Sequence, residues 1–334
     1  MARWWGAMVA LLALLLVPAT LTAQGAPTRI VAVGDLHGDY DAWIAIATDA
    51  GLIGPDKKWR GGRATLVQTG DIVDRGPDSL KIIRHLQALD REAKAAGGRV
   101  VVLLGNHEAM MVTGDLRYVH PGEYAAFADS RSAARREAAY KANQARIEES
   151  YRTQDATMSP AAIKQAWIKD TPLGKLEHNT AWGPNGELGR WAATLPAVAK
   201  VGDSLFAHGG LNGQYALIPI VEINRRARAA MQAGDPDPTL IINEESGPLW
   251  YRGLADGKGS GGRTAENELD AALKVNAAKR LVVGHTPSKE GIRIRYGGKL
   301  VLIDSAISRY YGGPLGWIEI VGDRVEPRVA ARGT

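Results

Sequence analysis

The chain has 334 residues, of which 45% are hydrophobic and 23% are charged, an ordinary composition for a folded protein of one large or two modest domains. Its net charge of +5 is dispersed, and no run of lysine and arginine interleaved with aromatic residues is present, which argues against nucleic acid as a partner. The chain contains no cysteine, so disulfides and a lipid anchor attached through a cysteine are excluded.

The first residues have the layout of a secretory signal peptide. Arg3 gives a positive start, residues 7–17 form a compact apolar run, Pro18 breaks it, and small residues lead up to Ala23. The apolar run is shorter than the roughly 20 residues that a membrane-spanning helix needs. We therefore expect cleavage that removes residues 1–23, a periplasmic or secreted mature protein, and no stable membrane association. An uncleaved anchor helix is the alternative.

The region that follows predicts a strand–helix–strand–helix–strand unit. Apolar runs at residues 30–33, 66–68 and 100–104 predict strands buried on both faces, and helical spacing of apolar residues at 40–50 and 79–96 predicts the helices between them. Such a unit winds right-handed around a parallel sheet. Ligands bind at the carboxyl ends of the strands in sheets of this kind.

The middle of the chain predicts helices only. Residues 115–190 are rich in Ala, Arg, Glu, Lys and Gln and have few β-branched runs, with helices expected at 133–151 and 160–168. We expect a helical insertion packed over or beside the site. It is either a cap that shapes substrate access or a structural elaboration.

Strands return in the last part of the chain. Apolar runs at residues 197–201, 204–207 and 280–283 predict strands, with helices at 220–233 and 265–278. Four further runs alternate with glycine turns and predict an antiparallel closing sheet, at residues 292–296, 299–303, 315–321 and 324–329.

Five short polar motifs lie beside glycines at the ends of predicted strands. In chain order they are GDLHGD (34–39), GDIVDRG (70–76), GNHE (105–108), HGG (208–210) and GHT (284–286). One such cluster alone is usually structural, but five in sequence order are hard to explain without a shared site. Their mixed oxygen and imidazole donors suit Mn, Fe or Zn better than Ca or Mg.

The motifs predict a site for two metal ions. The expected ligands are Asp35, His37 and Asp71 for one ion and Asp71, Asn106, His208 and His285 for the other. Asp71 is the expected bridge, since each carboxylate oxygen can bind one ion. Two ions roughly 3.5–4 Å apart share a water molecule, lower its pKa and present hydroxide in line with a phosphorus atom. A serine or cysteine nucleophile is therefore not needed.

Neighbouring groups are expected to act on the substrate. His107 could protonate the leaving oxygen as general acid, and Asp74 is suited to orient its imidazole and keep it protonated. Arg75 could form two hydrogen bonds to phosphoryl oxygens. The alternative for each is structural, because Asp–Arg pairs are usually turn or surface salt bridges. Structural roles are expected for the three remaining histidines, His85, His120 and His178.

Together these motifs resemble the calcineurin-like metallophosphoesterases, and most closely the phosphoprotein phosphatase branch. The spacing and the segment GPLWYRG at residues 247–253 are similar to the Shewanella-like phosphatases. The resemblance spans residues 27–334 and implies an α/β fold of four layers, a β-sandwich flanked by helices with a dinuclear centre between the sheets. It also implies the roles given above and makes Arg252 a second phosphate clamp. Residues 304–311 depart from the eukaryotic Ser/Thr phosphatases, so regulatory-subunit and toxin binding are not carried over.

The expected function is a secreted or periplasmic phosphatase that acts on phosphomonoesters, either phosphoprotein at Tyr or Ser/Thr or a small phosphoester. Its expected mechanism is in-line attack by a metal-bridging hydroxide, with His107 as general acid. The main alternative is a symmetrical dinucleoside polyphosphate hydrolase, since those enzymes share GDxHG, GDxxDRG and GNHE, although export argues against it. A further alternative is a non-catalytic, metal-dependent phosphate- or peptide-binding protein.

Overall fold

The computed structural model describes Met1 and residues 29–332. The predicted signal peptide, apart from Met1, therefore lies outside the described residues. Among the residues that are described, no helix is both long enough and apolar enough to cross a membrane.

The first sheet contains the predicted parallel unit. Its strand order is β10-β9-β1-β2-β3, with β1 parallel to β2 and β2 parallel to β3. The bounds are β1 (Ile30–Val33), β2 (Thr65–Gln68), β3 (Arg99–Val102), β9 (Leu315–Val321) and β10 (Arg324–Ala330). Helices α1 (Tyr40–Asp49) and α2 (Ser79–Ala95) connect the parallel strands and end one residue before their predicted ends.

The second sheet also has a parallel centre. Its order is β4-β5-β6-β8-β7, and β5, β6 and β8 run parallel. The bounds are β4 (Val198–Val201), β5 (Ser204–Ala207), β6 (Arg280–Val283), β7 (Arg293–Arg295) and β8 (Leu300–Leu302). The carboxyl ends of three parallel strands therefore meet at one edge in each sheet.

The predicted antiparallel closing sheet is wrong. The β7–β8 pair and the β9–β10 pair are each antiparallel, but they belong to different sheets, and β8 lies parallel to β6. Glycine turns indicate which consecutive strands pair with each other. They carry no information about the sheet that each pair joins, which explains the error.

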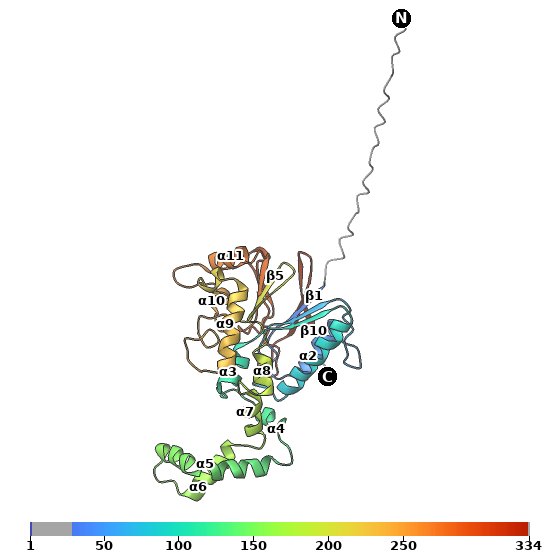
Figure 1. Cartoon of the computed structure of the whole chain (residues 1–334). Coiled ribbons are helices and arrows are strands. Elements are labelled where there is room, and N and C mark those ends of the chain that lie inside the picture. Colours follow the sequence, from blue (N-terminus) through green and yellow to red (C-terminus); the bar gives the residue numbers. More distant parts are fainter. Residues whose placement is uncertain (2–28, 333–334) are drawn as a thin grey trace.

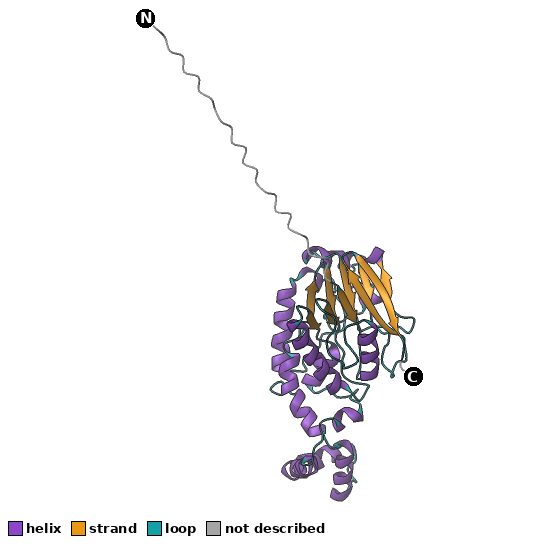
Figure 2. Cartoon of the chain, turned by 90° about the vertical axis from the view of Figure 1, so that its right-hand side faces the viewer, coloured by secondary structure: helices purple, strands orange, loops and turns teal. Residues whose placement is uncertain are grey.

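The two sheets pack face to face and form the predicted sandwich. A cluster of buried residues from both sheets lies between them, including Ala32, Val101, Phe206, Val282 and Ile318. A second, larger cluster joins the outer faces of the sheets to helices such as α1 and α2. Figure 2 shows the strands as neighbouring layers with helices around them. The predicted α/β sandwich flanked by helices is thereby confirmed.

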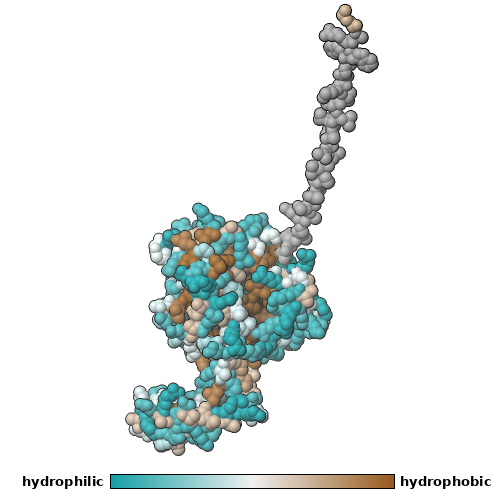
Figure 3. Space-filling view, in the orientation of Figure 1, coloured by the Kyte–Doolittle hydropathy of each residue, from teal (hydrophilic) through white to brown (hydrophobic). Residues whose placement is uncertain are grey.

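Within the described part of the chain, residues 115–190 contain helices and no strand, as predicted. They are α4 (Pro121–Ala125), α5 (Ser132–Gln154), α6 (Pro160–Asp170), α7 (Lys175–Trp182) and α8 (Glu187–Ala192). Helices α5 and α6, here called the arm, stand away from the body, with α4 and α7 between (Figure 1). The surface of the arm is largely hydrophilic (Figure 3). The expectation that the insertion packs over or beside the site does not hold for the arm. A role for this insertion in substrate access stays a prediction.

The remaining helices surround the sandwich. They are α3 (Asn106–Thr113), α9 (Ile220–Ala233), α10 (Gly253–Asp256) and α11 (Ala265–Val275), together with the short 3-10 helices η1 (Tyr215–Leu217) and η2 (Tyr296–Gly298). Helix α9 has its predicted bounds, and α11 ends three residues before its predicted end. Helix α3 begins inside the GNHE motif, so Asn106, His107 and Glu108 form its first turn.

Candidate metal centre

The five motifs converge at the carboxyl ends of the parallel strands, around a pocket of about 90 Å³. Seven of the ten predicted site residues line it, namely His37, Asp71, Arg75, Asn106, His107, Arg252 and His285. The other three, Asp35, Asp74 and His208, contact residues of this wall through their side chains. The structure therefore brings together every residue predicted for the site.

Asp71 lies at the centre of the cluster. Its Oδ2 atom is 3.2 Å from Nε2 of His208 and 3.8 Å from Nε2 of His37. Oδ1 of Asn106 lies 2.9 Å from the same Nε2 of His208. Asp71 and its histidine neighbours are buried. Asp71 belongs to both groups of side chains close enough to hold an ion, one with His37 and His107 and one with His208 and His285. Its role as the bridge between two ions stays a prediction.

Backbone carbonyls orient the three imidazoles. Nδ1 of His37 lies 2.9 Å from the Val73 oxygen and Nδ1 of His208 lies 2.8 Å from the Thr69 oxygen. In His37 this contact assigns the proton to Nδ1 and leaves the Nε2 lone pair for a metal. In His208 both ring nitrogens face oxygen atoms, and Nε2 is the nitrogen that points to Asp71 and Asn106, the other predicted ligands. In His285 the assignment made for His37 is reversed, because Nε2 lies 3.0 Å from the carbonyl oxygen of Trp250.

The charges of the cluster fit divalent cations. Burial and the carboxylates of Asp304 and Asp71 raise the pKa of Asp35 well above its usual value. Burial raises the pKa of Asp304 to about 6 and lowers the pKa of His37 to about 3. Burial lowers the pKa of His285 well below its usual value, whereas in His208 burial is outweighed by the Asp71 carboxylate, which raises the imidazole pKa. Buried carboxylates beside imidazoles form a donor set that fits bound cations, since a cation stabilises the ionised carboxylate and the deprotonated imidazole nitrogen. The residues present therefore fit the expected metals.

Backbone strain is concentrated at the same place. Nine non-glycine residues in the described part have positive φ, and five of them are predicted site residues: His37, Asp71, Asp74, Arg75 and His285. The left-handed conformation is unfavourable for residues with a Cβ atom, although Asp and His tolerate it better than most. Such strain persists where the surrounding structure imposes it, and it is common at functional sites.

His107 and Asp74 form the predicted pair. Nδ1 of His107 contacts Oδ2 of Asp74, and both side chains are buried. Burial disfavours the imidazolium, but the carboxylates of Asp71 and Asp74 outweigh it and raise the pKa of His107 above its usual value. Nε2 of His107 is left facing the pocket, 3.8 Å from Oδ2 of Asp71. This geometry also allows His107 to act as a metal ligand with His37 and Asp71, so metal content and activity must both be measured.

The two arginines approach the pocket differently. The Arg75 guanidinium lies over Tyr118, Tyr310 and Tyr311, at 4.5, 5.0 and 5.2 Å from the ring centres. Its buried Nε has no hydrogen-bond partner among the described residues. Nη1 of Arg252 donates to the His285 carbonyl at 2.7 Å, which holds this side chain against a predicted ligand.

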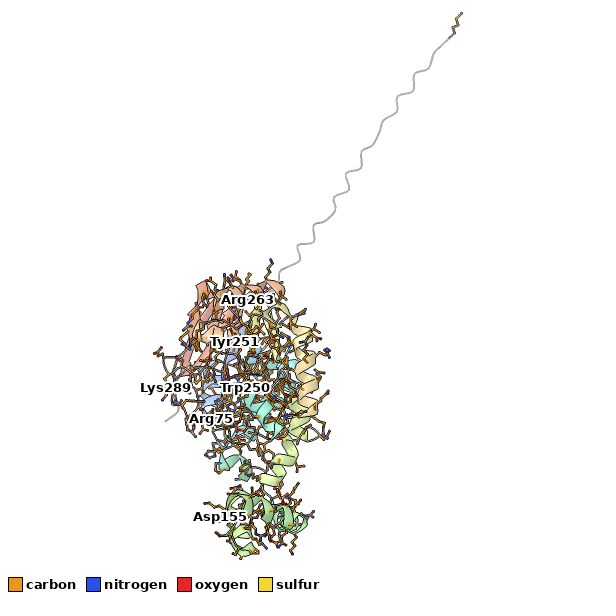
Figure 4. The ribbon with its side chains drawn as sticks, turned by 90° about the vertical axis from the view of Figure 1, so that its left-hand side faces the viewer. Arg75, Asp155, Trp250, Tyr251, Arg263 and Lys289 are labelled. Carbon is orange, nitrogen blue, oxygen red and sulfur yellow. The ribbon has the colours of Figure 1, made fainter. Side chains whose placement is uncertain are left out.

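Several residues of the site were not predicted. Asp304, Tyr118, Trp250 and Tyr311 line the pocket, and Figure 4 shows Arg75 and Trp250 in the same part of the body, far from Asp155 of the arm. Asp304 follows strand β8 as Asp35 follows β1, so the strand-end rule could have found it. Trp250 lies inside the segment GPLWYRG but was given no role, and Tyr118 and Tyr311 belong to none of the five motifs and give no such signal.

Glu108 is a further residue without a predicted role. Three backbone N–H groups donate to its carboxylate: those of Asp71 and Gly105, at 2.9 Å each, and that of Ile72, at 2.8 Å. Burial raises the pKa of Glu108 to about 7. The side chain thus ties the loop that carries Asp71 to the first turn of α3.

Replacing Glu108 by Ala should therefore lower the stability of the protein. Glu108→Ala leaves three buried donors without an acceptor, so the free energy of unfolding is expected to fall by about 3 kcal/mol. Urea denaturation measures this change. The control is Glu187→Ala, because the Glu187 side chain is 63% exposed and pairs with Arg84. The control should change stability by less than about 1 kcal/mol; equal effects of the two substitutions would contradict this role for Glu108.

Comparisons with known proteins agree with the geometry. Residues 28–289 match the family described as calcineurin-like phosphoesterase. The chain is 32% identical to an uncharacterized protein, C1840.07c, of Schizosaccharomyces pombe, over 86% of this chain and 75% of the relative. It is 31% identical to Shewanella-like protein phosphatase 2 of Arabidopsis thaliana, over 85% of this chain and 72% of the relative.

A solved structure is similar over most of the chain. It is described as a cold-active protein-tyrosine phosphatase of a psychrophile, Shewanella sp.. The TM-score is 0.66 with 27% identity, over 91% of this chain and 81% of that chain. Together, the motif geometry, the family match and these relatives show that the chain belongs to the calcineurin-like phosphoesterases, with Shewanella-like protein phosphatases among its relatives, and is a metal-dependent phosphoester hydrolase.

Proposed function

We propose that this protein is an exported phosphatase that uses two metal ions, drawn from Mn, Fe and Zn, to hydrolyse phosphomonoesters in proteins, with phosphotyrosine as the preferred residue. The observation that carries the substrate class is the aromatic rim of the pocket. This rim consists of Tyr118, which lines the pocket, and Tyr310, which lies next to it against Arg75. They are 39% and 63% exposed and flank Arg75. The similarity to the cold-active protein-tyrosine phosphatase of Shewanella sp. supports the same class.

The size and lining of the pocket support this assignment. A space of about 90 Å³ suits a phosphoryl group, and the aromatic ring of the substrate would then lie at the rim against Tyr118 or Tyr310. Aromatic pairs of this kind contribute about 0.5–1.5 kcal/mol beyond the burial of their surface. A serine phosphoester has no ring to make these contacts.

The residues of the chain divide the chemistry between them. The six predicted ligands would hold the ions, which, when bound, would offset the phosphoryl charge and lower the pKa of the attacking water. Arg75 and Arg252, which are far apart in the sequence but both line the pocket, would orient the phosphoryl oxygens. His107, aligned by Asp74, would donate a proton from Nε2 to the leaving oxygen.

Hydrolysis of three candidate substrates, compared side by side, tests the substrate class. The chain from Gln24 onward, supplied with manganese, would be given phosphotyrosine peptide, phosphoserine peptide and diadenosine tetraphosphate, and release of phosphate or nucleotide product would be followed for each. We expect the largest kcat/KM for phosphotyrosine peptide. A preference for phosphoserine would overturn the role of the aromatic rim, and a preference for the dinucleotide would overturn the phosphoprotein proposal.

Export is tested separately. In a bacterial host that exports the full chain, the mature protein is expected in the periplasm or the medium, beginning at Gln24. Fractionation and sequencing of the N-terminus give the result. A full-length chain that stays in the cytoplasm or the membrane would contradict export.

Removal of the Arg75 side chain should mainly weaken substrate binding. Arg75→Ala is expected to raise KM for phosphotyrosine peptide at least about tenfold, because a charge-assisted contact to phosphate is lost. Arg75→Lys should recover only part of this loss, since lysine does not offer the same planar pair of donors. Arg117→Ala is the matched control, because Arg117 also lies near Tyr118 but pairs with Asp115. An unchanged KM in Arg75→Ala would exclude this clamp.

A further inference from the structure

Among the residues that the structure describes, the outer edge of strand β3 carries backbone groups that pair with no other strand. The Arg99 N–H donates to the Ala64 oxygen at 3.1 Å and the Leu103 N–H to the Gln68 oxygen at 2.9 Å. These residues therefore direct their backbone groups toward β2. Alternate residues of a strand face opposite edges, so the N–H and C=O groups of Val100 and Val102 point outward. Within the described residues, β3 is the last strand of its sheet.

A groove of about 540 Å³ runs along this edge, far larger than the pocket at the metal centre. Its lining comes from β3, from α2 and from residues 191–196 in and after α8; Figure 1 shows α2 and α8 on the same lower side of the body. The Pro196 oxygen accepts a hydrogen bond from the Leu104 N–H at 3.0 Å. The segment after α8 thus pairs with the chain just beyond β3 and leaves the edge at Val100 and Val102 open.

The groove combines apolar contacts with positive charge. Val100, Val102 and Leu195 are only half-buried, although they pack against the core. Arg91 and Arg99 also line the groove and are exposed. Neither has an ion-pair partner among the described residues, whereas Lys94 and Asp90, which also line the groove, pair with each other at 2.6 Å. Two cations without partners therefore stand beside an open strand edge.

We propose that this edge is a docking site for an extended acidic segment of a partner protein, which adds to the sheet as a strand beside β3. An antiparallel strand opposite Val100 or Val102 would exchange both hydrogen bonds with that residue. Its alternate side chains would reach the apolar floor, and its carboxylates would meet Arg91 and Arg99. Main-chain pairing with side-chain selection is an established mode of peptide recognition.

The same charges argue against a second copy of this chain as the occupant. Pairing of two β3 edges would place Arg91 and Arg99 of each copy close to those of the other, and like charges across an interface are unfavourable. Basic residues beside an exposed edge protect it from self-association, yet they attract an acidic strand. The proposal does not depend on the substrate of the metal centre, because the groove and the pocket are separate.

Binding of a designed peptide tests the proposal. The probe is a fluorescein-labelled heptapeptide of alternating glutamate and valine, titrated into the full mature protein while anisotropy is followed. We expect saturable binding below about 1 mM. A lysine–valine peptide, and a glutamate–valine peptide with alternate amides N-methylated, should each bind at least about tenfold more weakly. Hydrogen exchange at the amides of Val100 and Val102 should slow when the first peptide is bound.

Charge reversal supplies the matched variants. Arg91→Glu with Arg99→Glu should weaken peptide binding by about tenfold or more, while hydrolysis of p-nitrophenyl phosphate is unchanged. The control is Arg228→Glu with Lys274→Glu, the same change of charge at exposed positions of α9 and α11; it should bind the peptide as the unmodified protein does.

Three outcomes would overturn the proposal. The first is no saturable binding at about 1 mM peptide, and the second is equal weakening in both double variants. The third is a concentration-dependent dimer, measured by sedimentation, whose formation protects Val100 and Val102 from exchange, because the edge would then bind a second copy. None of these three outcomes depends on phosphatase activity, so a wrong substrate assignment leaves the test intact.

Discussion

Asp71→Asn is expected to lower kcat by at least about 10³-fold and to reduce the amount of metal bound by the purified protein. The carboxylate lies between Nε2 of His208 and Nε2 of His37, at 3.2 and 3.8 Å. An amide in its place has one oxygen and no charge, so it cannot bridge two cations or balance their charge. Phosphate release, elemental analysis and circular dichroism measure activity, metal content and fold.

The control for this variant is another aspartate whose charge is not needed at the site. Asp270 is exposed on α11 and pairs with Lys299 at 2.7 Å. Asp270→Asn should keep full activity and full metal content. If Asp71→Asn kept both activity and metal while folded, the assignment of the metal centre would be wrong.

The second large effect is expected for His107→Asn. Loss of a general acid should lower kcat by roughly 10²–10⁴-fold with little change in KM. The loss should be greater for phosphoserine peptide than for p-nitrophenyl phosphate, because nitrophenolate leaves without needing a proton. Bound metal should be unchanged. Asp74→Asn should have a smaller effect of the same kind, since Asp74 acts by orienting and charging the imidazole.

These measurements separate the two roles that the geometry allows for His107. A variant that loses metal together with activity would make His107 a ligand beside His37 and Asp71, and a loss independent of the leaving group would exclude the acid role. His120→Asn is the matched control. Nδ1 of His120 accepts the Gly122 N–H at 3.0 Å at the start of α4, a cap that asparagine can replace.

The metal centre could be predicted from the sequence because its residues follow a simple rule. Parallel strands end at the same edge of a sheet, so the polar residues after β1, β2 and β3 had to lie close together. The same rule brought His208 and His285 from β5 and β6. The glycines around these residues mark tight turns. They distinguish the five motifs from ordinary polar loops.

The error in the closing sheet explains why Asp304 was missed. Interpreted as one strand of an antiparallel sheet, the run before Asp304 gave no reason to place its carboxyl end at the site. In the structure β8 is parallel to β6, so Asp304 joins Asp35 and Asp71. The direction of a strand depends on its neighbours in the sheet, and a short apolar run does not encode them.

The aromatic rim and the position of the arm could not be predicted either, because neither leaves a periodic pattern in the sequence. Tyr118, Tyr310 and Trp250 come from loops, where single residues have no periodic pattern to identify them. The arm was predicted as helical from composition, but composition does not give its direction. Only Ser132 and Tyr140 of α5 are buried, so few contacts bind this helix to its neighbours.

The left-handed backbone at five site residues has a consequence for the stability of the protein in different media. If each such position costs on the order of 1 kcal/mol, the summed cost reduces the free energy of unfolding of the metal-free chain considerably. The whole stability of a typical domain is only about 5–15 kcal/mol. Ions that bind only the folded state raise the free energy of unfolding as their concentration rises, and so offset this cost. The chain contains no cysteine and so no disulfides. If it is exported as proposed, its lifetime outside the cytoplasm would depend on the local supply of metal, and chelation would expose it to proteolysis.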